Sequence, residues 1–189
     1  MRVVGKIGSV GVVACAVLAL AACGSDDKSE TATPTTTAAA SSANAAAQPE
    51  SKGRECTADD IAVQGGYGET PTITIPDDCD PPKTLITKDL VVGTGPAAKA
   101  GDKLSTNYTL ITWSDKKKLD SSFDRGKELP LTLGAGQVIQ GWDQGLEGAT
   151  EGTRRLLVIP PDLGYGASGK GGMKPNETLV FVTDVVKVG

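Results

Sequence analysis

The most regular alternation of side chains in the sequence runs from Lys103 to Trp113 and predicts a β-strand. Successive side chains of a strand point to its two faces in turn. One face would carry Leu104, Thr106, Tyr108, Leu110 and Thr112, and the other Ser105, Asn107, Thr109, Ile111 and Trp113. The polar residues 114–117 predict a hairpin turn at the end of this strand.

Runs of aliphatic and β-branched residues predict the other strands of the same domain. These runs cover residues 85–92, 118–123, 129–133, 153–159 and 178–188. Gln140–Leu146 is the only segment that we interpret as a helix. Strands interrupted by one short helix indicate an α+β fold, which the sequence predicts as a single domain over residues 84–189.

Residues 53–83 have a different pattern. Thr72–Pro76 alternates with period two and predicts one short strand that ends at the proline. The glycines of 65–68 predict a turn. Because so short a segment buries too little surface to fold alone, we expect it to pack on the domain as an N-terminal extension.

The first 22 residues have the pattern of a secretory signal peptide, in which Arg2 and Lys6 precede an apolar run. That run is short for a membrane span, which needs about 20 apolar residues. Leu20-Ala21-Ala22-Cys23 resembles a bacterial lipobox, in which the chain is cut before an acylated cysteine. We expect Cys23 to carry acyl chains, palmitate among them. A signal peptide with a chance cysteine, or an uncleaved anchor, is the alternative.

Residues 23–52 are expected to form a disordered tether. Between Ser29 and Gln48, 16 of 20 residues are Ala, Ser or Thr, and none is aromatic. Such a segment cannot bury enough apolar surface to offset the entropy lost on ordering. The tether would hold the domain away from the membrane without fixing its orientation.

The remaining cysteines, Cys56 and Cys79, lie on either side of the extension. In the oxidising compartment that an export signal implies, a disulfide between them is favoured over two free thiols. Zinc is not expected, because the chain has no histidine and two cysteines do not complete a zinc site. Four cysteines are present in all, and Cys15 would leave with the signal peptide.

Charge and composition argue against several other functions. Cleavage before Cys23 would change the net charge from −4 to −6, which does not suit nucleic-acid binding. The absence of histidine excludes Ser-His-Asp and Cys-His catalysis. Residues 164–169 match the dinucleotide pattern GxGxxG, but Pro160-Pro161 precede it and glycines follow, so we expect a long flexible loop in place of the required helix.

Seven segments, in order, resemble FKBP-type peptidyl-prolyl cis-trans isomerases. The most specific is Gln137-Val138-Ile139-Gln140-Gly141-Trp142. The other six are Asn107-Tyr108-Thr109, Leu119-Asp120-Ser121-Ser122 with Asp124-Arg125, Leu131–Gly134, Glu151–Arg154, Ile159–Gly166 and Pro175–Phe181. The resemblance implies an FKBP-like antiparallel half-barrel sheet wrapped around one short helix, with a pocket between them.

The resemblance also assigns roles to individual residues. Trp142 would floor the pocket, and the backbone N–H of Ile139 would bind a carbonyl oxygen of the substrate. The catalytic residues it implies are Tyr108, Asp120, Ile139, Trp142, Tyr165 and Phe181, with Asp120 near Tyr108 at the rim and Tyr165 opposite. The other pocket residues it implies are Leu119, Arg125, Leu129, Gln137, Val138 and Met173. Packing in an ordinary core is the alternative for each aromatic residue.

Several positions depart from the family pattern. Leu119 and Leu129 stand where the family commonly has aromatic residues, and Met173-Lys174 where apolar residues are usual. The hairpin 112–118 is one residue longer. These departures predict a less aromatic pocket, with weak macrolide binding but preserved isomerase activity.

The resemblance implies a prolyl isomerase that needs no cofactor. With the lipobox, it predicts a monomer lipid-anchored on the outer face of the cytoplasmic membrane, in the bacterial cell envelope. Its partners would be proline-containing exported polypeptides, whose folding it would assist. The alternative is an FKBP-like chaperone or adaptor module with little or no isomerase activity.

Overall fold

A computed structural model describes residues 51–189. The predicted signal peptide, Cys23 and nearly all of the tether lie outside the described residues. Within residues 51–189, no helix combines the length and the apolar character needed to cross a membrane.

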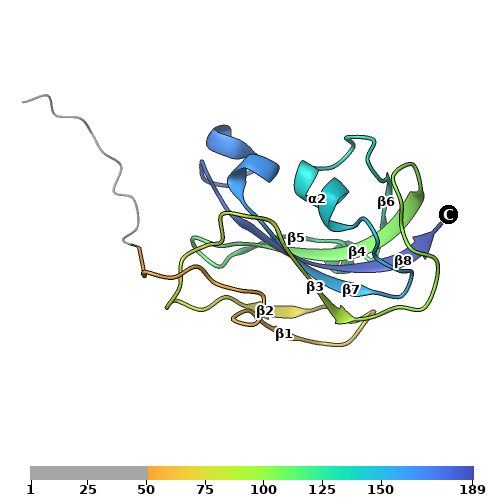
Figure 1. Ribbon diagram of the computed structural model, residues 1–189, viewed down its shortest axis with the longest axis horizontal. Coiled ribbons are helices and arrows are strands. Elements are labelled where there is room, and N and C mark those ends of the chain that lie inside the picture. Colours follow the sequence, from red (N-terminus) through yellow and green to blue (C-terminus); the bar gives the residue numbers. More distant parts are fainter. Residues whose placement is uncertain (1–50) are drawn as a thin grey trace, which may run out of the picture. The chain divides into compact units, whose positions relative to one another are not determined.

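The described chain consists mainly of antiparallel strands (Figure 1). The elements are β1 (Ala62–Gln64), β2 (Thr72–Thr74), β3 (Ile86–Val91), β4 (Lys103–Thr112), β5 (Lys118–Ser121), α1 (Ser122–Arg125), β6 (Leu129–Thr132), α2 (Gln140–Gly145), β7 (Arg154–Ile159) and β8 (Leu179–Val188). The main sheet has the order β3-β7-β8-β4-β5, and β6 also pairs with β4. Figure 1 shows α2 on one side of this sheet and the β1-β2 hairpin on the other.

Strand β4 is buried on both of its faces from Tyr108 onward, and its alternation follows the sequence prediction. Tyr108 and Leu110 lie in the core beneath α2. Ile111 and Trp113 lie in a second core on the opposite side of the sheet. The half-barrel predicted from the sequence is therefore confirmed, with apolar layers on both sides of the sheet.

The second core is closed by the N-terminal extension. Cys56 and Cys79 form a disulfide, as predicted, and pack with Ile61 and Ile75 against the sheet. The apolar side chains of β7 and β8 in this layer are Leu156, Val158, Val180 and Val182.

A buried ion pair also joins the extension to the sheet. Arg154 of β7 and Asp184 of β8 are each about 1% exposed, and the Arg154 Nε lies 2.6 Å from an Asp184 oxygen. The Arg154 guanidinium also donates to the carbonyl oxygens of Gly65 and Glu69, at 2.8 and 2.6 Å. The Gly68 N–H donates to the Asp184 carboxylate at 2.8 Å. The 65–69 loop therefore supplies the hydrogen bonds that such a buried pair requires.

The structure corrects the predicted strand 118–123, which ends at Ser121 and continues as helix α1. The Ser122 hydroxyl accepts a hydrogen bond from the Tyr108 N–H at 2.9 Å, so a side chain replaces the next backbone partner in the ladder. Gly126, with a φ of 61°, ends the helix in a left-handed conformation. Gln140–Leu146 is thus not the only helical segment.

Two further predictions of local structure were wrong. The loop after Pro160 contains two short 3-10 helices, Pro161–Leu163 and Gly166–Ser168. Proline suits the first turn of a helix, so the Pro160-Pro161 pair does not prevent the first of them. The extension has two strands, because Ala62–Gln64 pairs with Thr72–Thr74.

Candidate functional site

Two glycines of helix α2 allow the helix to lie close to the sheet. A Cβ atom at Gly141 would lie 2.4 Å from the Ile159 side chain, and one at Gly145 would lie 2.8 Å from Leu157. The adjacent residue, Trp142, is 3% exposed and is thereby held against the middle of the sheet.

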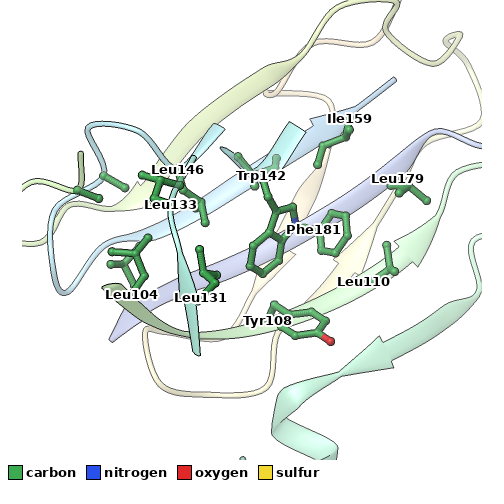
Figure 2. Packing of buried hydrophobic residues seen from close by; sticks show 14 residues of the cluster. Leu104, Tyr108, Leu110, Leu131, Leu133, Trp142, Leu146, Ile159, Leu179 and Phe181 are labelled. Atoms are coloured by element: carbon green, nitrogen blue, oxygen red, sulfur yellow. The ribbon is translucent and has the colours of Figure 1, made fainter. Parts of the chain in front are cut away.

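Three aromatic side chains meet at this point (Figure 2). The Trp142 ring stands edge-on to both Tyr108 and Phe181, with centroid distances of 5.4 and 5.3 Å. Tyr108 and Phe181 are 6.1 Å apart. These are favourable geometries for aromatic pairs, and they fix the floor and walls of a pocket with side chains from α2, β4 and β8.

A pocket of about 210 Å³ opens above these rings. The structure brings nine of the residues assigned from sequence into its lining: Tyr108, Asp120, Leu129, Gln137, Val138, Ile139, Trp142, Tyr165 and Phe181. Leu110 also lines the pocket and was not assigned to it. The alternation along β4 could have identified Leu110, because it places Leu110 on the same face of the strand as Tyr108.

The other three assigned residues lie outside the lining. Leu119 and Met173 are partly buried and pack against the same hydrophobic core as the pocket aromatics. Arg125 lies at the rim, where its guanidinium stands 5.6 Å from the centroid of the Tyr108 ring and donates to the Tyr108 hydroxyl at 3.0 Å.

Asp120 connects the groups of the rim. It accepts hydrogen bonds from the Tyr108 hydroxyl, from Arg125 and, at 2.8 Å, from the Ser121 N–H. Partial burial opposes its ionisation, but the hydrogen bonds from Tyr108 and Arg125 outweigh that effect, so the pKa of Asp120 lies below its ordinary value. Burial raises the pKa of Tyr108, and the hydrogen bond to Asp120 adds to the rise. The rim thus carries a carboxylate and a protonated phenol at neutral pH.

The pocket interior offers few polar groups. The Trp142 Nε1 atom is buried and has no hydrogen-bond partner within residues 51–189. The Ile139 backbone N–H, which precedes helix α2, also has no acceptor among the described residues. Burial raises the pKa of Tyr165, and the Asp120 charge adds to the rise, so this phenol too stays protonated.

Such an arrangement suits binding better than proton transfer or nucleophilic attack. A nucleophile needs an adjacent base, and the lining contains no serine, cysteine, lysine or histidine. One cluster of metal-ligand type exists in the described residues, Cys56, Asp60 and Cys79, but its two sulfur atoms are joined in the disulfide and are not thiolates. The pocket can instead hold an apolar ring beside one backbone donor.

Comparison with known proteins agrees with this geometry. Residues 95–186 match the family described as FKBP-type peptidyl-prolyl cis-trans isomerase. A "FK506-binding protein" of Streptomyces anulatus is 47% identical over 122 residues, which cover 64% of this chain and 98% of that protein. The chain belongs to the FKBP-type isomerase family. A second "FK506-binding protein", from Neisseria meningitidis serogroup A, is 46% identical over 56% of this chain and 96% of its own.

A solved FKBP-type structure gives the same result for the fold. The crystal structure of AtFKBP13 superposes with a TM-score of 0.51 at 37% identity, over 56% of this chain and 93% of that one. The predicted FKBP-like fold is thereby confirmed.

Proposed function

We propose that the protein is an active peptidyl-prolyl cis-trans isomerase that acts on exported polypeptides. The observation that carries the proposal is the apolar pocket of Tyr108, Trp142 and Phe181 beside the Ile139 N–H. It is supported by membership of the isomerase family.

The mechanism follows from the bond to be rotated. Rotation about a peptide bond costs about 18–20 kcal/mol because resonance is lost, and no proton or nucleophile is needed. The pocket would hold the proline ring against Trp142 while the chain outside it turns. An apolar surface disfavours the more dipolar planar amide, and the Ile139 N–H would hold a carbonyl oxygen of the twisted one. Interactions that are stronger in the transition state than in the ground state lower the barrier.

Tethering to the membrane is part of the same proposal. It is supported by the lipobox-like Leu20–Cys23 and by the Ala, Ser and Thr-rich residues that follow. One acyl chain anchors only marginally and several anchor stably, so multiple acylation of Cys23 would keep the enzyme on the outer face of the membrane. Mass spectrometry of the protein from membranes tests this, and an unmodified Cys23 would contradict it.

Leu129 supports a second candidate, a chaperone or adaptor module with little catalysis. Its aliphatic side chain forms part of the pocket wall where the family commonly has an aromatic ring. The same residue underlies our proposal of weak macrolide binding. A macrolide would lose aromatic contacts there, and the change Leu129→Phe should therefore strengthen its binding.

A prolyl isomerisation assay on the full chain distinguishes the two candidates. We expect acceleration by the wild type and a loss of at least about tenfold in Trp142→Leu, since the floor loses its ring edges. Tyr108→Phe, which keeps the ring but removes the hydroxyl, should lose less. A folded wild type without acceleration would favour the chaperone module. Equal rates in the wild type and both variants would exclude the mechanism.

A further inference from the structure

A second hollow, of about 660 Å³, lies between the N-terminal extension and the loop that follows β7. The two hollows share that loop. Tyr165 lines the isomerase pocket, and the next two residues, Gly166 and Ala167, line the second hollow. Because consecutive Cα atoms are about 3.8 Å apart, a polypeptide held in the pocket could extend into the hollow within a few residues.

The surface of this hollow is rigid and largely apolar. Pro81 and Pro82 come from the extension, and Pro160 and Pro161 from the loop after β7. Proline rings fix φ and lack an N–H donor. Such a wall loses little conformational entropy when a chain packs on it.

The charges around the hollow are mostly negative. Glu55, Asp80 and Asp162 line it together with a single basic residue, Lys83. Glu55 lies 3.4 Å from the Lys83 ammonium, and Asp80 accepts a hydrogen bond from the Lys52 N–H at 2.8 Å. Asp162 is exposed and forms no salt bridge within residues 51–189. It is therefore available to an incoming cation.

We propose that this hollow binds the part of a polypeptide substrate that flanks the isomerised proline, and that it favours segments carrying Lys or Arg. The inference rests on the proposed isomerase function and names a substrate preference for it. The chain's own tether fits less well, because residues 23–52 contain four acidic residues and only two lysines. Opposite charges across an interface favour the complementary partner over like-charged ones.

The test uses the full chain and three fluorescent peptides. One has four residues around an X–Pro bond, and two extend it on both sides with three lysines or three glutamates. Fluorescence anisotropy gives the Kd of each. We expect the lysine peptide to bind about three- to fivefold more tightly than the glutamate peptide at low salt, as for exposed charge pairs. This difference should shrink at 0.5 M salt, which shortens the Debye length to about 4 Å.

Two charge variants locate the preference. Asp162→Lys should abolish it, whereas Glu147→Lys, the same change at an exposed carboxylate outside both hollows, should retain it. Equal binding of both long peptides by the wild type would overturn the proposal, as would identical behaviour of the two variants. Ala167→Trp, which fills the hollow, should remove the advantage of the long lysine peptide over the four-residue one.

Isomerase turnover of the same peptides separates this proposal from the proposed function. Normal turnover without a preference for the lysine peptide would refute the proposed role of the hollow and leave the isomerase function intact. An inactive wild type refutes the isomerase, and the anisotropy series then decides on the hollow by itself. Binding of the long peptides only after removal of residues 24–50 would show that the tether occupies the hollow, and would overturn the proposal.

Discussion

Asp120 organises the pocket rim although its side chain is 42% exposed. It receives the Tyr108 hydroxyl from β4 and the Arg125 guanidinium from α1, and so joins two elements at the edge of the pocket. Its charge fixes the direction of the Tyr108 O–H, which donates and therefore points away from the pocket floor. The rim depends on one ionised carboxylate.

This dependence predicts a flat pH profile for activity. The chain has no histidine, the pKa of Asp120 is lowered, and that of Tyr108 is raised. We expect kcat/KM to stay constant from about pH 5 to 9 and to fall only below the ordinary Asp pKa of about 3.9. Asp120→Asn should be less active and should lack the acid limb. Stopped-flow assays across this range test it, and a titration near pH 6.5 would contradict it.

The sign of the effect on stability follows from the same pKa. Because folding lowers the pKa of Asp120, its ionised form stabilises the native state at any pH above its unfolded value. That contribution disappears as the pH falls through the folded pKa. Acid should therefore destabilise the wild type relative to Asp120→Asn.

The residues of the site were largely predictable from sequence, and the exceptions have physical reasons. The run from Gln137 to Trp142 is local, so one segment places several lining residues at once. The alternation placed Leu110 on the same face of β4 as Tyr108. It did not indicate how far along the strand the pocket extends. Leu119 was assigned to the pocket by the family resemblance, but its partly buried side chain packs against the core without lining the pocket.

At the scale of the element, helix α2 contains two glycines although glycine has a low helix propensity. A glycine inside a helix costs about 1 kcal/mol relative to alanine. Gly141 and Gly145 are retained at that cost because a side chain at either position would push the helix off β7. The close approach also sets the depth of Trp142.

Gly141→Ala should consequently destabilise the protein, by about 1–3 kcal/mol from overpacking against Ile159. Gly145→Ala should cost less, since its closest neighbour is the flexible end of Leu157. Gly66→Ala, where the new Cβ meets nothing closer than 3.6 Å, is the control and should stay within about 0.5 kcal/mol. Urea unfolding measures all three. A stabilising Gly141→Ala would show that propensity outweighs the contact.

Two of the elements that the sequence did not predict form through contacts outside their own segments. Strand β1 is only three residues long, Ala62–Gln64, and pairs with β2. Helix α1 begins at Ser122, whose hydroxyl accepts a hydrogen bond from the Tyr108 N–H of β4, fourteen residues earlier in the chain. Neither contact leaves a periodic pattern within its own segment, and periodicity is the main sequence signal of an element.

At the scale of the molecule, the Arg154–Asp184 pair connects the sheet with the extension. Removing one partner of a buried pair leaves an uncompensated charge, which typically costs about 3–5 kcal/mol. We expect Arg154→Met to lose about that much, and Arg154→Met with Asp184→Leu to be more stable than Arg154→Met alone. Thermal unfolding provides the comparison. Additive losses in the double variant would mean that the loop contacts of Gly65, Gly68 and Glu69 matter more than the charges.

The disulfide acts on the same interface. Cys56 and Cys79 are 23 positions apart, and closing a loop of that size stabilises the folded state by about 3 kcal/mol in the chain-entropy model. Reduction should lower Tm and expose the 65–69 loop to proteases before the rest of the domain unfolds. Cys56→Ser with Cys79→Ser is the matched variant. An unchanged Tm after complete reduction would show that packing alone holds the extension.

Because of the second core, the folded unit of this protein begins earlier in the chain than the match to the family model. The match to the family model begins at residue 95, whereas the unit that excludes water from both faces of the sheet includes Cys56, Ile61 and Ile75. A gene segment exchanged along the family boundary would carry the pocket but leave Trp113, Val180 and Val182 without their cover. For this protein, the segment that matches the family model is smaller than the segment that folds as one unit.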